Sequence, residues 1–184
     1  MKATPLERQY QKLQKAILNR RSYRTLLSYW SAFIRLRDAY ECVVCGEKYK
    51  VSAHHIFRKC FIPEAQFETG NGITLCKDCH KEAHLDFNKK PDLNLPIGSE
   101  GGEKLELIMA HYAVLLDDAK SRGILHDKYY YVSDPMLAFL KRAQGYDIYH
   151  PFHGSTRLEE AYRIWASPNP TIVAAMLKAS FPAY

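Results

Sequence analysis

The sequence lacks any long hydrophobic run, and this absence excludes one class of protein at once. No stretch of the 184 residues approaches 18 consecutive apolar side chains, so we expect no transmembrane helix. The opening residues, MKATPLERQYQKLQKAILNRR, are too polar for a signal peptide, and we therefore expect a cytoplasmic protein. Internal repeats and low-complexity tracts are also missing. Hydrophobic residues make up 47% of the chain, so most of it should fold.

Acidic residues are scarce in the first third of the chain. Residues 1–60 hold 13 Lys and Arg but only 4 Asp and Glu, whereas residues 61–184 hold 13 and 16. The first part therefore carries a charge of +9 and the remainder a charge of −3. A basic front end suits a polyanionic partner such as nucleic acid. An ordinary solvated face of a basic helix would give the same count, so charge alone does not decide between the two.

Apolar residues recur at helical spacing before and after a central segment, and the residue pattern of that segment is not helical. The pattern predicts helices at about 6–20 and 22–38, the second with Ser22 as its N-cap. A linker rich in Pro and Gly follows the central segment, at 88–102. Four more helices are expected after it, at about 101–121, 134–144, 156–166 and 170–180. The sequence KYYYVSD between them is either a short strand or an exposed aromatic patch.

The central segment carries short β-like runs broken by turns. YKVSAHHIF, residues 49–57, alternates and contains β-branched side chains, so it predicts a strand. ITL, residues 73–75, predicts a second strand. A helix is expected to start near Asp78 and to run to about Phe87.

The chain has only five cysteines, and four of them form two CxxC pairs with 30 residues between the pairs. In a cytoplasmic chain this spacing favours metal binding over disulfides. Four thiolates fill the tetrahedral shell of a structural zinc ion, so we expect zinc on Cys42, Cys45, Cys76 and Cys79. Cys60 is left over and is expected to be a buried or loop thiol.

Four histidines lie among these cysteines, and a closed zinc shell has no need of them. His80 and His84 are four residues apart on the expected helix, so they project from one face. His54 and His55 are adjacent on a strand and point to opposite sides, unless the strand is distorted or ends there. This suggests a division of labour, in which one side chain holds a metal and another acts on substrate. The competing arrangement is a zinc shell in which a histidine replaces one cysteine.

These motifs, read in order, resemble the HNH endonuclease family, which has the ββα-metal fold. The matching elements are Cys42-x-x-Cys45, AHHI, GNGITLC and CKDCHKEAH, and they cover about residues 40–86. The resemblance implies an α+β fold with a small ββα-metal core and structural zinc. The core is flanked by basic N-terminal helices and a mostly helical C-terminal region. The expected divisions of the chain are 1–39, 40–88 and 89–184.

The resemblance also implies a role for each matching residue. His55 stands where the family has its general base, and Asn71 where an asparagine tethers the loop and orients that base. His54 and His80 stand at ligands of a catalytic divalent metal. His84 matches a further ligand found in the histidine-rich branch, such as the colicin nuclease domains. The implied reaction is hydrolysis of phosphodiester bonds in DNA, which leaves 5′-phosphate and 3′-hydroxyl ends.

The identity of the catalytic metal stays open at this point. Imidazole ligands favour zinc, nickel, manganese or cobalt over magnesium in affinity. The family nevertheless often works with magnesium or manganese. A neutral imidazole is in any case suited to take a proton from water near pH 7, which agrees with the role implied for His55.

Two groups of cations are candidate DNA contacts. Arg20, Arg21 and Arg24 lie on the basic N-terminal helices and are expected to form most of the footprint. Arg58 and Lys59 directly follow the catalytic strand and could contact neighbouring phosphates, although two exposed loop cations would look the same.

Two biological settings and two classes of function remain in competition. Small HNH proteins resemble phage-encoded or homing endonucleases, whereas others are bacterial defence effectors that work beside an ATPase partner. The helical region 101–184 lies in the part of the chain with a net charge of −3, residues 61–184, and this mildly favours a protein partner over DNA as its own contact. The alternative to an enzyme is a non-catalytic zinc module that binds nucleic acid or a partner protein. His55 discriminates between the two, because a binding module does not need a base beside a ligand.

Overall fold

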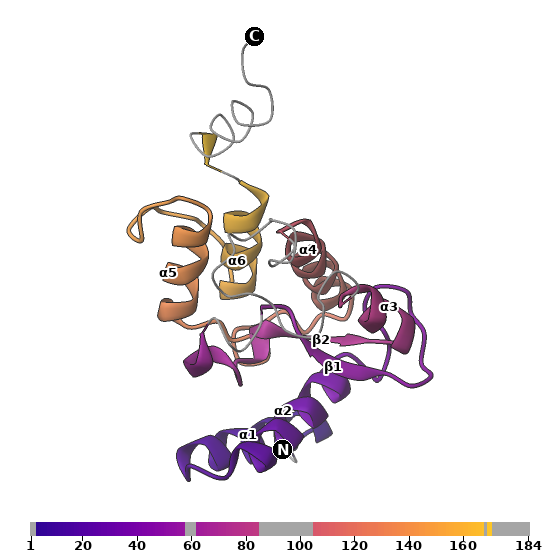
Figure 1. The fold of residues 1–184 in the computed structure, drawn as a ribbon. Helices are drawn as coiled ribbons and strands as arrows, with labels where there is room; N and C mark the ends of the chain where they lie inside the picture. The colour runs from indigo at the N-terminus through magenta and orange to yellow at the C-terminus, as the bar shows by residue number, and fades with distance from the viewer. Residues whose placement is uncertain (1–2, 58–61, 85–104, 168, 171–184) are drawn as a thin grey trace.

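The computed structural model describes residues 3–57, 62–84, 105–167 and 169–170. Its helices are α1 (Pro5–Leu18), α2 (Tyr23–Arg37), α3 (Lys77–Glu82), α4 (Leu105–Ser121), α5 (Asp134–Ala143) and α6 (Arg157–Ala166). Its strands are β1 (Ser52–His55) and β2 (Gly72–Leu75). The strand pair lies in the middle of the molecule. In Figure 1 the helices α1 and α2 lie below the strands, and the helices α4, α5 and α6 lie above them. The fold is α+β, as the sequence predicted.

Local capping explains where the first two helices begin. The Thr4 hydroxyl accepts a hydrogen bond from the Glu7 backbone N–H at 3.1 Å, and Pro5 occupies the first helical turn. Ser22 accepts from the Thr25 N–H at 3.4 Å, which confirms Ser22 as the predicted N-cap of α2. The apolar faces of the two helices then pack into a small core of their own, formed by Leu13, Trp30, Phe33 and Ile34.

The strands form an antiparallel pair in which His54 lies opposite Ile73 and His55 opposite Gly72. The first strand is shorter than the sequence predicted, since it begins at Ser52 and ends at His55. Two 3₁₀ turns, Pro63–Ala65 and Thr69–Asn71, precede β2. Because β1 ends at His55, the chain turns away immediately after the two adjacent histidines.

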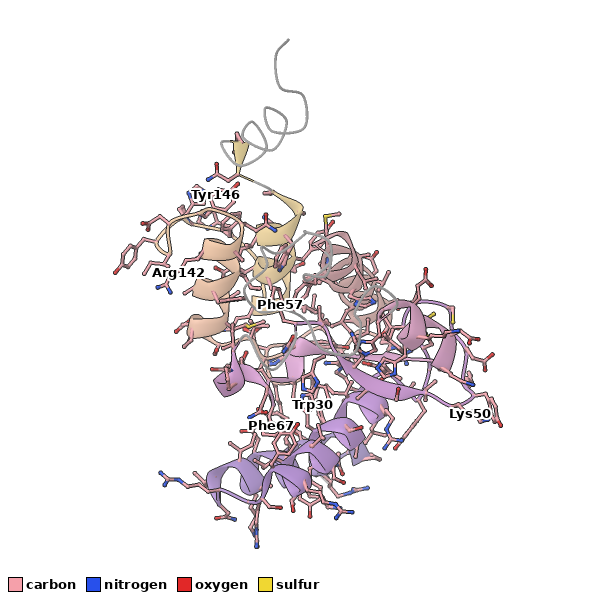
Figure 2. All side chains as sticks on the ribbon, in the orientation of Figure 1. Trp30, Lys50, Phe57, Phe67, Arg142 and Tyr146 are labelled. Atoms are coloured by element: carbon pink, nitrogen blue, oxygen red, sulfur yellow. The ribbon has the colours of Figure 1, made fainter. Side chains whose placement is uncertain are left out.

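The main hydrophobic core joins the strands to the C-terminal helices. Phe57 stacks on Trp165 of α6 with ring centres 5.4 Å apart, and it meets Phe139 of α5 edge-on at 5.3 Å. Figure 2 shows Phe57 on the side of these helices, whereas Trp30 and Phe67 lie on the side of α1 and α2. Ile73 of β2 belongs to the same core as Phe57. The C-terminal helices therefore support the strands from one side and the N-terminal helices from the other.

Arg37, the last residue of α2, lies in the interior of the protein, unlike the exposed Arg20, Arg21 and Arg24. Its side chain is fully buried and paired with Asp38 at 2.7 Å. The guanidinium also donates to the carbonyls of Thr69 at 2.6 Å and Gly72 at 2.7 Å, and it lies over the ring of Tyr130. Buried charges of this kind persist only when fully paired. Arg37 thus fastens the end of α2 to the start of β2.

The segment KYYYVSD forms neither of the two structures that the sequence left open. It contains no strand, and its central Tyr130 is fully buried, although Tyr131 is 44% exposed. Its backbone packs on the turn before β2, where the Gly70 N–H donates to the Tyr131 carbonyl at 2.8 Å. A Cβ on Gly70 would lie within 3.0 Å of this segment, so glycine permits the close approach.

Several predictions fall outside the described residues: the linker 88–102, the helix at 170–180, and Arg58, Lys59 and Cys60. Helix α4 is described from Leu105, and α3 ends at Glu82. Within the described ranges, none of the helices has the length and apolar character needed to cross a membrane.

Candidate active site and metal centres

The four paired cysteines converge from two separate parts of the chain. Cys42 and Cys45 lie in a tight turn after α2, in which the Gly46 N–H donates to the Cys42 carbonyl at 2.7 Å. Gly46 adopts a positive φ of 78°, which suits glycine and closes this knuckle. Cys76 is the N-cap of α3 and Cys79 lies in its first turn.

The sulfur atoms have the spacing that zinc requires. All four lie within 4.8 Å of one another. Cys45 Sγ is 3.7 Å from the sulfurs of both Cys76 and Cys79. Sulfurs that share one zinc ion at a Zn–S distance of about 2.3 Å lie about 3.8 Å apart in a tetrahedron. The cluster therefore has the donor chemistry and geometry of a structural zinc site.

The thiols differ in acidity because their surroundings differ. The Cys79 backbone N–H donates to Cys76 Sγ, and this bond lowers the pKa of Cys76. Burial, followed by the neighbouring thiols, raises the pKa of Cys79. Four thiolates in one place need a cation to hold them deprotonated, which agrees with the fit to zinc.

Three histidines form a second candidate metal site on one side of β1. His54 from the strand meets His80 and His84 from α3 and its C-terminal end, and their ligand atoms all lie within 4.8 Å of one another. The Nε2 atoms of His80 and His84 are 3.1 Å apart. Imidazole nitrogens bound to one ion at about 2.1 Å lie about 3.0–3.4 Å apart. The three rings thus fit a shared metal ion.

The protonation of these rings also suits metal binding. Burial, and then the neighbouring imidazoles, lower the pKa of His54 well below its ordinary value. Burial, and then His84, lower the pKa of His80. Both rings are therefore neutral near pH 7, which is the form that binds metal. The second nitrogen of His80, Nδ1, lies 3.3 Å from the Ser52 hydroxyl, a contact that fixes the ring with Nε2 toward His84.

A further histidine lies against this cluster. His111 of α4 is only 3% exposed, and its ring centre is 5.7 Å from that of His54, with the planes 74° apart. Burial lowers the pKa of His111 to about 4, so this ring too is neutral near pH 7. The sequence did not single out His111. The one signal was a histidine on the apolar face of a predicted helix.

His55 lies on the other side of the strand and contacts different groups. Its ring stacks on the indole of Trp30, with centres 4.1 Å apart and planes 9° apart. Its Nε2 is 2.8 Å from the Gln66 carbonyl oxygen. A carbonyl can only accept, so Nε2 carries the hydrogen and the lone pair of the neutral ring is on Nδ1. This tautomer offers one ring nitrogen as a proton acceptor.

Asn71 holds the chain just after His55. Its side chain is buried, accepts from the Phe57 N–H at 2.7 Å and donates to the Phe57 carbonyl at 3.0 Å. The Asn71 carbonyl also accepts from the Ile56 N–H at 3.1 Å. Asn71 therefore fixes the point at which the backbone leaves the strand, immediately beyond the two histidines.

The glycine opposite His55 explains why Trp30 can reach it. A Cβ on Gly72 would lie 2.6 Å from the Trp30 ring and 2.7 Å from Ile34. The absence of a side chain there lets α2 approach the strands closely, so that the indole covers one face of His55. Trp30 Nε1 then donates to the Glu68 carbonyl at 3.1 Å. Neither Trp30 nor Gln66 could be identified from the sequence as a partner of His55.

The predicted cationic residues of the N-terminal helices lie at the turn between α1 and α2. Arg20, Arg21 and Arg24 are all exposed. A groove of about 320 Å³ lies between the two helices, and two lysine side chains line it together with Arg21. Its lining includes Lys12, Lys15, Arg21, Asn19, Thr25 and Tyr29. Arg58 and Lys59 lie outside the described residues.

Comparison with known proteins agrees with this geometry. Residues 42–82 match the family model described as HNH endonuclease. Neither the curated proteins nor the solved structures contain a match to the chain. The match begins at the first cysteine of the knuckle and ends with α3, so it holds the four cysteines, His54, His55 and His80. Residues 42–82 thus carry the HNH endonuclease signature that the sequence predicted, and this match indicates a nuclease that binds nucleic acid.

Proposed function

We propose that the protein is a metal-dependent endonuclease that hydrolyses phosphodiester bonds in DNA. The observation that carries this proposal is the placement of two adjacent histidines on two faces of one strand end. His54 faces the imidazoles of α3, whereas His55 stacks on Trp30 with its tautomer set by Gln66. Two adjacent histidines on a strand were expected to reach one site only if the strand is distorted or ends at that point. Strand β1 ends at His55.

His55 would act as the general base. Its Nδ1 takes a proton from water, the water oxygen bonds to phosphorus, and the bond from phosphorus to the 3′ oxygen breaks. The departing oxygen collects a proton from solvent, which leaves 5′-phosphate and 3′-hydroxyl ends. A divalent ion on His54, His80 and His84 would supply positive charge for the scissile phosphate and the departing oxygen.

Three contacts support His55 as a positioned base rather than a free surface imidazole. Gln66 fixes its hydrogen on Nε2, and Trp30 restricts rotation of the ring. Asn71 holds the following backbone through Phe57. A base held in one orientation accelerates proton transfer, whereas a binding module gains nothing from this arrangement.

The DNA would lie across the α1–α2 turn. Arg20, Arg21 and Arg24 are exposed there, and Lys12 and Lys15 line the adjacent groove with Arg21. Exposed cations along one groove contact phosphates and position the duplex without reading its sequence. Arg58 and Lys59, which follow His55 closely in the chain, would bind phosphates beside the scissile one.

The biological setting of such a nuclease is a separate proposal. The helical region 101–184 lacks the excess of Lys and Arg found in residues 1–60, and this favours a protein partner over DNA for the C-terminal helices, such as the ATPase of a bacterial defence system. A phage-encoded or homing endonuclease would have no need of this partner.

A plasmid assay tests the proposed function. Purified protein should convert supercoiled DNA to nicked or linear forms when magnesium, manganese or nickel is present, and a chelator should stop the reaction. The products should be joined by a DNA ligase without further treatment, because ligation requires 5′-phosphate and 3′-hydroxyl ends. DNA binding without cleavage under any of these metals would favour the non-catalytic zinc module.

A further inference from the structure

We propose that His111 is a positioning residue of the candidate catalytic metal centre. In this role the His111 ring accepts a hydrogen bond from the ring N–H of His54 that does not face the metal, and so orients the His54 ring. The inference rests on the proposed function, because it takes His54 to be a metal ligand. His111 lies on α4, outside the segment 42–82 that matches the family model. The role therefore belongs to a part of the chain for which the family match says nothing.

The position of His111 on its helix is the first argument. Ile108, Tyr112 and Leu115 share the buried face of α4 and belong to the main hydrophobic core. An imidazole among them costs free energy, because its polar nitrogens leave water. An aliphatic side chain would fill such a place at less cost. A polar ring is expected at this position only if it interacts with another polar group, and the neighbouring polar ring is that of His54.

The second argument is that the His54 ring requires a hydrogen-bond acceptor for its other ring N–H. A metal-bound histidine almost always donates its other ring N–H to an acceptor. His80 has the Ser52 hydroxyl at its second nitrogen. In the described part of the chain the His54 ring makes no hydrogen bond, and its ring contacts are His80, His84 and His111. Since His80 and His84 share the side on which the metal would bind, His111 is the ring left to accept from His54.

The distance is consistent with this role. The two rings make no hydrogen bond in this structure, and with ring centres 5.7 Å apart their edges can approach to about 3.5 Å, the outer limit of a hydrogen bond, only when the edges face each other. Metal binding makes the remaining N–H of an imidazole a stronger donor. A small rotation of the His111 ring would then close the contact. Helix α4 would in this way couple the C-terminal region to the metal centre.

Nickel(II) titration of zinc-loaded protein tests the role without any cleavage assay. Nickel is chosen because imidazole suits it, and loading with a single equivalent of zinc fills the cysteine site and leaves the histidines to bind nickel. The variants are His111→Phe, which keeps a ring but has no acceptor, and His111→Gln, whose amide oxygen can accept. His153→Gln, at an exposed position, is the matched control. Zinc content and the thermal midpoint without nickel are measured for each variant, so that any loss of folding is visible.

We expect His111→Phe to weaken nickel binding by about 10- to 100-fold, the usual effect of removing such a partner. His111→Gln should lose less, and His153→Gln should bind as the wild type does. Wild-type affinity in folded His111→Phe would overturn the positioning role, and so would equal losses in the Phe and Gln variants. If the zinc-loaded wild type bound no nickel at all, the catalytic metal centre itself would fail, and the proposed function with it.

Discussion

The indole ring of Trp30 lies flat on the imidazole of His55, with ring centres 4.1 Å apart and planes 9° apart. The two residues belong to α2 and β1, and the contact is possible because Gly72 opposite His55 has no side chain. Trp30 is therefore a core residue of the N-terminal helical pair, and its indole ring also limits rotation of the His55 imidazole, the candidate base.

Replacing Trp30 with Leu should reduce cleavage by more than the loss of stability explains, because His55 would gain rotational freedom. Both effects can be separated with Phe33→Leu, a change in the same small core at a residue whose ring contacts are with Tyr10 and Tyr129. Unfolding free energies should fall in both variants by roughly 1–4 kcal/mol. Cleavage rates are compared at a temperature where both are folded. Equal rates in the two variants would show that Trp30 only packs.

The cysteine cluster should carry most of the stability of the strand region. Structural zinc in a small module contributes on the order of 10 kcal/mol to folding, so Cys79→Ser should lose the zinc and unfold the residues around β1 and β2. His80→Ala, by contrast, should keep both zinc and fold. Elemental analysis and circular dichroism measure these outcomes, with Lys81→Ser on the exposed side of the same helix end as control. A purified, folded protein with reduced cysteines and no zinc would refute this assignment.

Replacing Asn71 with Ala should both destabilise the protein and slow cleavage. The change leaves the Phe57 N–H and carbonyl without their partner, and each unsatisfied buried group costs about 1–3 kcal/mol. The backbone after His55 would also lose its tether. Urea unfolding and plasmid cleavage are measured beside Tyr149→Ala, an exposed position far along the chain from the candidate site and the groove. Wild-type stability and rate would mean that Asn71 has no tethering role.

Neutralising Arg20, Arg21 and Arg24 with Gln should weaken DNA binding for all sequences alike. Each lost phosphate contact should lower the slope of log affinity against log salt by about 0.9. The control is the pair Arg142→Gln and Arg163→Gln, exposed cations on α5 and α6. An unchanged slope in the triple variant, with a reduced slope in the control, would move the footprint to the C-terminal helices.

The sequence predicted those features that depend on local spacing. Two CxxC pairs located the zinc cluster, the i, i+4 spacing of His80 and His84 predicted their shared face, and Ser22 marked the start of α2. The four cysteines and the three histidines His54, His80 and His84 lie together as this spacing required, although their roles as ligands remain predictions.

Contacts between distant segments could not be predicted in the same way. Arg37 reads as one more surface arginine, yet its partners include backbone carbonyls more than 30 residues away. Trp30 and His111 reach the candidate site from α2 and α4, and only the packing of those helices on the strands brings them there. Periodicity identifies the buried face of a helix but does not identify the element that covers it.

The most direct test is a metal titration of plasmid cleavage for His55→Ala and His80→Ala beside wild type, with His153→Ala as an exposed control. His55→Ala should keep zinc and DNA affinity but cleave roughly 10²–10⁴ times more slowly, the usual effect of losing a positioned base, and added manganese should not restore it. His80→Ala should also lose cleavage, but excess manganese should restore part of it, because the defect is in metal affinity. If His55→Ala cleaved DNA at the wild-type rate, His55 would not be the base and the central claim would be wrong.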